Sequence, residues 1–293
     1  MFLERTTPRS RAGRLIPASP KIYAHLPYVI ELDDEVVRTR DNALMLSLEV
    51  TGIDGVTSGA AAVSALRAGF AHLLDTLDER FTFYLHRMMR PADTGILPIH
   101  GLSFAADIDK AWSREIDRRN LQDSVLILTV VRRQVAPLAV PLFGKAAARV
   151  WGEDTARRLE ELREVTSILE TGLGIKTRRM KISDGSLVGF YASLLTGELR
   201  DYPRSPYCLL AEDAAGASVQ FGKGLVEIEE GTPTPKLAAV LYVKSYANAT
   251  WPGMLDALGA AQDTIITHSY TPIERGSIAE RVNRASTAAP PRL

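Results

Sequence analysis

Hydrophobic and polar residues alternate regularly in the first apolar part of the chain. In residues 43–50 every second position holds a leucine or a valine: Leu44, Leu46, Leu48 and Val50. This is the period of a strand with one buried face. Residues 35–39 are also strand-like, and a polar turn at residues 40–42 separates the two segments. We therefore predict a β-hairpin over residues 35–50.

Two segments have the period of a helix instead. In residues 58–77 the larger apolar side chains recur every three or four positions, as on the buried face of an amphipathic helix. Residues 104–119 follow the same rule, with Ile108, Trp112 and Ile116 on the apolar side. We predict a helix over each segment.

Strands are predicted after each of these helices. Residues 81–89 are rich in aromatic side chains, and residues 123–132 contain the run Val-Leu-Ile-Leu-Thr-Val-Val, which is typical of a buried strand. The order from residue 35 to residue 132 is then β-β-α-β-α-β. This order indicates a sheet with helices on one face.

The middle of the chain is predicted to be mainly helical. Residues 145–171 have the pattern of one long helix, in which Gly152 marks a candidate break. Residues 184–195 form a further predicted helix, and Gly197 is suited to end it. Short strands are then predicted at residues 207–211, 218–221 and 225–228.

The last apolar unit has the order strand, helix, strand, at residues 236–246, 251–258 and 263–270. Pro272 suits the first position of a further helix. This order repeats that of residues 43–90. We predict an α/β (α+β) protein with mixed sheets and helices packed on them, and two degenerate ferredoxin-like halves are one arrangement that fits.

Composition and charge narrow the class of protein. Hydrophobic residues make up 46% of the chain and charged residues 24%, as in folded globular proteins. The 35 basic residues balance the 35 acidic ones, so no overall charge attracts the chain to nucleic acid or to an anionic membrane. Cys208 is the single cysteine, which excludes an intrachain disulfide. No apolar run approaches the ~20 residues of a membrane-spanning helix, so we expect no such segment.

The two ends of the chain differ from the rest. Residues 1–14 carry four arginines against one glutamate. We predict that residues 1–21 form a basic flexible tail, with a contact to lipid or to a partner protein as the alternative. Residues 285–293 are mostly small residues and prolines, and we predict a second flexible tail there.

Nucleotide-binding motifs are the first chemistry to test. A P-loop combines an upstream glycine, a Gly-Lys pair and a following Ser or Thr, because backbone amides hold the phosphates and the hydroxyl holds magnesium. Gly-Lys pairs occur at residues 144–145 and 222–223, but each lacks both the upstream glycine and the hydroxyl residue. We therefore expect neither ATP nor magnesium to bind at these lysines.

The sequence gives equally weak signals for a metal site and for a catalytic nucleophile. The histidines have no metal-ligand spacing. These histidines are His25, His72, His86, His100 and His268. A nucleophile pair of His86 with Cys208 is conceivable only if the fold brings the two together. We assign no catalytic, cofactor-binding or metal-binding residue.

Arginine recurs at the predicted ends of extended segments. The basic residues concerned are Arg87, Arg90, Arg132, Arg133, Arg178, Arg179 and Lys181. If the strand ends are neighbours, these side chains form an anion or nucleic-acid patch. If each faces a nearby Asp or Glu, they are ordinary surface charges, which is the more common case.

Several segments together resemble the N-terminal domain of the CagE/TrbE/VirB family of type IV secretion ATPases. The resemblance lies in their order and spacing. The segments are 25–28 (His-Leu-Pro-Tyr), 36–41 (Val-Val-Arg-Thr-Arg-Asp), 81–87 (Phe-Thr-Phe-Tyr-Leu-His-Arg), 120–133, 186–197, 243–246, 250–253 and 267–270.

The resemblance implies a domain over residues 22–284, with a subdivision near residues 135–145. Family members continue into a RecA-like domain that binds ATP and magnesium, and no residue here matches its motifs. We therefore expect a docking and assembly module that lacks the hydrolytic domain and is not an enzyme by itself. The alternative is a nucleic-acid-binding module that uses the arginine-tipped strands.

The family also implies where such a module works. Its expected location is cytoplasmic, peripheral at the inner membrane, where the full-length protein energises conjugation or the transfer of effectors or DNA. Its expected partners are inner-membrane components of the type IV secretion machine and further copies of the same chain, so we predict a homo-oligomer.

Overall fold

The computed structural model describes residues 22–53, 57–92, 104–119, 121–134, 145–222, 224–229, 235–243, 254 and 264–273. Its helices are η1 (Ile22–His25), α1 (Ala60–Thr76), α2 (Phe104–Arg119), α3 (Lys145–Gly172), α4 (Ser186–Thr196) and α5 (Leu210–Ala214). Its strands are β1 (Tyr28–Glu31), β2 (Val36–Thr39), β3 (Leu44–Thr51), β4 (Phe81–Pro91), β5 (Gln122–Arg132), β6 (Lys176–Arg179), β7 (Ser218–Phe221), β8 (Val226–Glu229), β9 (Lys236–Ala238) and β10 (Ile265–Tyr270).

The main sheet has the strand order β1-β2-β3-β5-β4-β10. Strand β3 pairs with β5 along one edge, and with β2 and then β6 along the other. A small second sheet has the order β7-β8-β9, and every strand pair described is antiparallel. The predicted α+β class with helices packed on sheets is confirmed.

The first hairpin forms where the alternating pattern predicts it. Strands β2 and β3 pair with Val36 opposite Leu46, and Asn42 in the turn has a φ of 62°. Asparagine tolerates this left-handed conformation better than most residues. The Thr39 hydroxyl and the backbone of Ala43 close the turn with hydrogen bonds of 3.2 and 3.0 Å.

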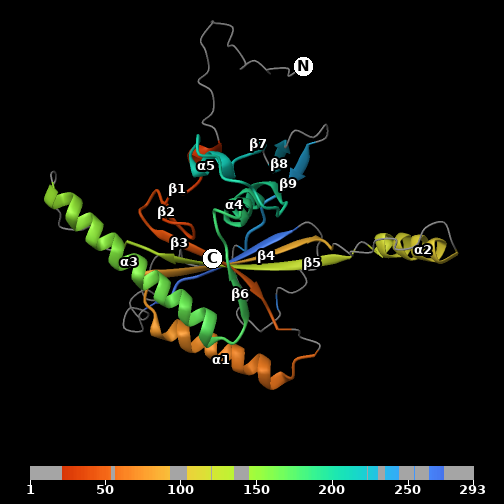
Figure 1. Ribbon diagram of the computed structural model, residues 1–293, viewed down its shortest axis with the longest axis horizontal. Coiled ribbons are helices and arrows are strands. Elements are labelled where there is room, and N and C mark those ends of the chain that lie inside the picture. The colour runs from red at the N-terminus through yellow and green to blue at the C-terminus, as the bar shows by residue number, and fades with distance from the viewer. Residues whose placement is uncertain are drawn as a thin grey trace, which may run out of the picture.

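One face of the main sheet is covered by α1 and α3 (Figure 1). The even-numbered residues of β3 point to this face and are buried, as the sequence predicts. They meet Leu73 of α1 and a row of apolar side chains on α3. The members of that row are Leu162, Val165 and Leu169.

The opposite face of the sheet is covered by α4 and α5 (Figure 1). Helix α4 is buried along most of its length, and Tyr191 stacks on Tyr28 of β1 with ring centroids 3.9 Å apart. Ile127 of β5 packs in the same cluster. The sheet is therefore a middle layer between two helical layers, and the expectation of helices on one face holds only for α1.

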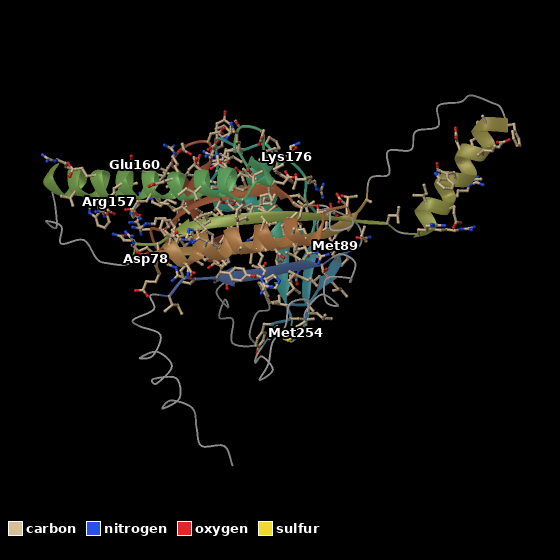
Figure 2. The ribbon with its side chains drawn as sticks, turned by 90° about the horizontal axis from the view of Figure 1, so that it is seen from below. Asp78, Met89, Arg157, Glu160, Lys176 and Met254 are labelled. Atoms are coloured by element: carbon tan, nitrogen blue, oxygen red, sulfur yellow. The ribbon has the colours of Figure 1, made fainter. Side chains whose placement is uncertain are left out.

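Helix α2 departs from that expectation as well. It lies outside both helical layers, beyond the end of the paired strands β4 and β5 (Figure 1). Figure 2 shows the same separation from another side, with α2 well past Met89 of β4. The apolar period predicts the helix correctly but not its packing.

Three further predictions need correction or limits. Helix α3 is continuous through Gly152, because one glycine costs a helix only about 1 kcal/mol. Residues 207–211 do not form a strand, because Glu212 Oε2 accepts a hydrogen bond from the Leu209 amide and caps α5. Residues 239–243 do not continue β9.

The last unit does not repeat the first. Strand β9 pairs with β8 in the small sheet, whereas β10 pairs with β4 in the main sheet, so the two belong to different sheets. The degenerate-halves arrangement therefore has no support in the topology. The predicted helix at residues 251–258, apart from Met254, and most of the one after Pro272 lie outside the described residues.

Glycine substitutions test the packing of α4 against the segment that follows it. A Cβ at Gly189 would lie 1.9 Å from the Arg200 carbonyl oxygen, whereas nothing lies within 4 Å of one at Gly152. We expect Gly189→Ala to lower the free energy of unfolding by about 3 kcal/mol, since backbone must move. Gly152→Ala should raise it by about 0.5–1 kcal/mol. Chemical denaturation measures both, and equal effects would contradict the packing described.

Candidate protein-interaction surface

Helix α2 presents a row of apolar side chains to solvent. Phe104, Ile108 and Trp112 follow one another at four-residue spacing and are 81%, 53% and 61% exposed. Ile116 continues the row and is half-buried. Side chains four residues apart share one face of a helix, so the four form one surface, called here the α2 row.

The helix stands at the tip of a long hairpin. Strands β4 and β5 pair without interruption from Phe81 opposite Arg132 to Pro91 opposite Gln122. The Ala92 amide then donates a 2.8 Å hydrogen bond to the Leu121 carbonyl, which fixes the base from which α2 departs. The sheet therefore positions the helix without covering its row.

Charges within α2 favour the helical conformation locally. Asp107 lies in the first turn, and Arg118 and Arg119 lie in the last turn, so each sign faces the opposite end of the helix dipole. Glu115 lies 3.6 and 3.5 Å from the two arginines across one turn. Exposed pairs of this kind contribute only a few tenths of a kcal/mol each.

The predicted arginine patch does not form among the described residues. Arg132 is buried beside Phe81, 5.4 Å from its ring centroid, and donates a 2.6 Å hydrogen bond to Glu161 of α3. Because β4 and β5 are antiparallel, Arg87 and Arg90 lie toward the opposite end of the sheet from Arg132. The strand-end arginines are therefore split between two places.

The arginines of β6 are paired with acidic residues. Arg178 donates hydrogen bonds of 3.0 and 2.5 Å to Glu49 on the neighbouring strand. Arg179 donates to both oxygens of Glu170, at 2.9 and 2.8 Å, and to Glu35 at 3.0 Å. These carboxylates raise the pKa of both guanidinium groups. The geometry therefore favours the interpretation that these arginines are ordinary surface charges, each facing a nearby carboxylate.

His86 and Cys208 are not brought together by any described contact. His86 Nδ1 lies 2.9 Å from the Thr267 hydroxyl, and its ring meets the Phe190 ring edge-on at 5.2 Å. Cys208 Sγ donates a hydrogen bond of 2.8 Å to Asp213, which raises the pKa of the thiol. A raised thiol pKa disfavours the thiolate, so this pair has no activated nucleophile.

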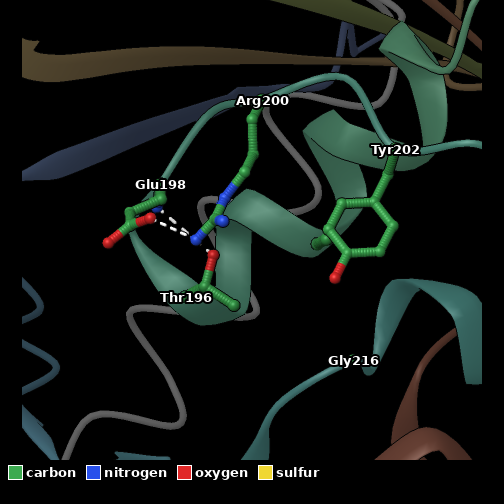
Figure 3. Close-up of a pocket in the computed structure, with 6 residues that line it drawn as sticks. Thr196, Glu198, Arg200, Tyr202 and Gly216 are labelled. Carbon is green, nitrogen blue, oxygen red and sulfur yellow. Dashed lines mark hydrogen bonds and ion pairs between the residues drawn. The ribbon is translucent and has the colours of Figure 1, made fainter. Parts of the chain in front are cut away.

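A small pocket lies between the end of α4 and the segment that follows it (Figure 3). Glu198 and Arg200 form an ion pair at its rim, next to Thr196, and the Tyr202 ring lines the other side. The charged groups therefore neutralise each other instead of converging on a ligand. In the described ranges no group of three His, Cys, Asp or Glu side chains could hold a metal ion.

Among the helices that the structure describes, none is long and apolar enough to cross a bilayer.

Comparison with protein-family models matches residues 35–138 to the N-terminal domain of the type IV secretion system ATPase VirB4/TrbE. The resemblance predicted from the sequence is confirmed over this stretch. The matched residues include β2 to β5, α1 and the whole of α2. No curated protein matched the chain. The domain over residues 22–284, its subdivision near residues 135–145 and the two flexible tails stay predictions.

Because His86 is buried, we predict that the free energy of unfolding depends on pH. Desolvation lowers the pKa of His86 to about 4, from about 6.5 in an unfolded chain. The unfolded chain therefore binds the proton first, and stability falls as the pH drops from about 6.5 to about 4. The loss should reach roughly 3 kcal/mol at pH 4, measured by urea denaturation. His86→Leu should remove this part of the slope, and the exposed His72→Gln should keep it. An unchanged slope in His86→Leu would refute the assignment.

The paired arginines make a second prediction. Arg179→Met should lower the free energy of unfolding by about 2 kcal/mol, because it leaves two carboxylates without their partner. Arg178→Met should cost less than about 1 kcal/mol, since that pair is more exposed. Neither variant should change the affinity for duplex DNA in a salt titration. If either variant bound duplex DNA more weakly than the native chain, and the difference grew as the salt concentration fell, the nucleic-acid alternative would be restored.

Proposed function

We propose that this chain is a docking and assembly module of a type IV secretion ATPase. Its work is to attach to protein partners at the cytoplasmic face of the inner membrane, among them inner-membrane components of the secretion machine and other copies of the chain. ATP hydrolysis belongs, in this proposal, to a different domain of the full-length ATPase. The family match over residues 35–138 supports the system to which the module is assigned.

The observation that carries the docking role is the exposed α2 row. Burying one large apolar side chain stabilises a complex by roughly 1.5–3 kcal/mol before the costs of association. Three such side chains, Phe104, Ile108 and Trp112, lie on a single helix face. Contiguous exposed apolar surface on a folded domain marks an interaction site.

The surroundings of the row support docking over catalysis. The sheet fixes the base of α2, and the rest of the helix is free to enter a groove on a partner or to pair with another helix. By contrast, the described titratable groups outside α2 are largely committed to internal pairs, as at Arg132, Arg178 and Arg179.

Fractionation of cells that carry the secretion machine tests the proposal. The chain should sediment with the inner membrane, and the double variant Ile108→Ser with Trp112→Ala should move to the supernatant, because the row is lost. Arg149→Ser on α3 is the matched control, since Arg149 is exposed on another helix and should leave the distribution unchanged.

Two results would contradict this function. One is a double variant that folds normally by circular dichroism and still sediments with the membrane. The other is a native chain that sediments equally well in cells without the machine, since its attachment would then not depend on the proposed partners.

A further inference from the structure

We propose that strand β10 binds an extended, uncharged segment of another protein, which adds to the main sheet as a further antiparallel strand. The site is separate from the α2 row and goes beyond the proposed function, since β10 lies outside the stretch that the family model matches. Recognition of this kind takes its affinity from main-chain hydrogen bonds and its specificity from side chains at alternate positions.

The outer edge of β10 carries main-chain groups that no strand of the described ranges meets. The Met89 amide donates a 2.9 Å hydrogen bond to the Thr264 carbonyl, so these two residues form a bonded pair of the antiparallel ladder. Bonded and non-bonded pairs alternate along such a ladder. The N–H and C=O groups of Ile265, Thr267 and Ser269 therefore point away from β4.

Strand β1, at the other end of the strand order, is protected against strand addition. Its register with β2 shifts between Tyr28 and Ile30. Leu210 and Ala214 of α5 pack in the same cluster as Tyr28. Irregular pairing and a covering helix are two means by which proteins keep the edge of a sheet from pairing with another chain.

Strand β10 has neither of these devices in the part of the chain that the structure describes. Its register against β4 is unbroken from Ile265 opposite Met88 to Tyr270 opposite Phe83. It also contains no proline and no charged residue, which are the other common blocks to edge pairing. A regular, uncharged edge of this kind accepts a further strand.

The side chains of β10 define the chemistry of the segment that fits. Thr267 lies on the α4 side of the sheet, where its hydroxyl is 2.9 Å from His86 Nδ1, and Ser269 shares that face. Both residues are exposed, whereas Ile266 and His268, on the opposite face, are half-buried. Cross-strand neighbours on one face interact best when they are alike in polarity. The segment should therefore alternate hydroxyl and apolar side chains.

The size of the edge favours a peptide segment over a second copy of the chain. Six residues at about 3.4 Å each span roughly 20 Å, and a sheet is about 10 Å thick, so pairing covers roughly 200 Å² on each side. Two copies paired through β10 would then bury about a third of the ~1,200 Å² at which stable interfaces begin. A linear segment has no such requirement, because its own main chain supplies the contact.

A designed peptide tests the site on the full chain. The probe is the blocked peptide Thr-Val-Ser-Ile-Thr-Val, which has hydroxyl side chains on one face and apolar side chains on the other. In NMR spectra of the isotopically labelled chain, it should shift the amide signals of Ile265, Thr267 and Ser269 and leave those of α2 unchanged. The row variant Ile108→Ser with Trp112→Ala should bind it equally well, since the two surfaces are separate.

N-methylated peptides test the hydrogen bonds themselves. With its hydroxyl face on the α4 side, the peptide points the amides of its Thr and Ser residues at β10. N-methylation at Ser should weaken binding about tenfold, because one main-chain hydrogen bond is lost. N-methylation at Ile should leave the affinity within about twofold, since that amide points to solvent.

A matched pair of variants tests the same edge from the side of the chain. Ser269→Pro removes an outward amide without touching the ladder to β4, and proline is tolerated at such edge positions. It should weaken binding about tenfold or more, whereas Ser269→Ala keeps the amide and should bind like the native chain. Circular dichroism should show the same fold in both.

Three results would overturn the inference. One is a peptide that shifts no β10 amide at its solubility limit. Another is equal weakening by both N-methylated peptides, which would show that main-chain pairing with β10 does not hold the peptide. The third is protection of the outward β10 amides in the native chain alone as its concentration rises, since a second copy would then be the occupant.

Discussion

Strand β3 is hydrogen-bonded along both edges and covered on both faces, and the other elements are arranged around that requirement. Its leucines need an apolar layer on one side, which α1 and α3 supply. On the other side Ser47 is fully buried, and its hydroxyl shares a 2.9 Å hydrogen bond with Thr129 of β5. The buried Tyr191 hydroxyl lies close to Ser47 but makes no hydrogen bond of good geometry. A polar pair at the centre of the sheet thus fixes the register of β3 against β5.

The same sheet explains why function is expected at its periphery. Charged side chains near the sheet mostly complete ion pairs between layers. Asp154 and Arg158 form an ion pair within α3 that is almost wholly buried, and Arg158 also joins this helix to the sheet by donating a 2.6 Å hydrogen bond to the Asn42 carbonyl at the β2–β3 turn. Groups committed in this way hold helices on the sheet and are unsuited to bind a ligand. The hairpin of β4 and β5, in contrast, extends past the layers and carries α2 with its apolar row uncovered.

Much of this fold follows from the sequence because period and turn chemistry act locally. The alternation in β3, the length of β5 and the stop of α4 at Gly197, whose φ is 78°, were all predictable on those grounds. The packing of α2 was not, because an apolar stripe shows that a face needs a cover without showing what covers it. The arginine pairs were hidden for a related reason. Arg178 meets Glu49 across 129 residues of sequence, and only the strand register brings them together.

The central claim is that α2 is the part of this chain which its partners cover. Hydrogen exchange in the free chain and in the assembled secretion machine tests it most directly. The α2 amides, residues 104–119, should exchange quickly in the dilute free chain and become protected in the machine, while β5, already in the middle of the sheet, should change little. If α2 exchanged as quickly in the machine as in the free chain, with protection gained elsewhere, the docking account would be wrong.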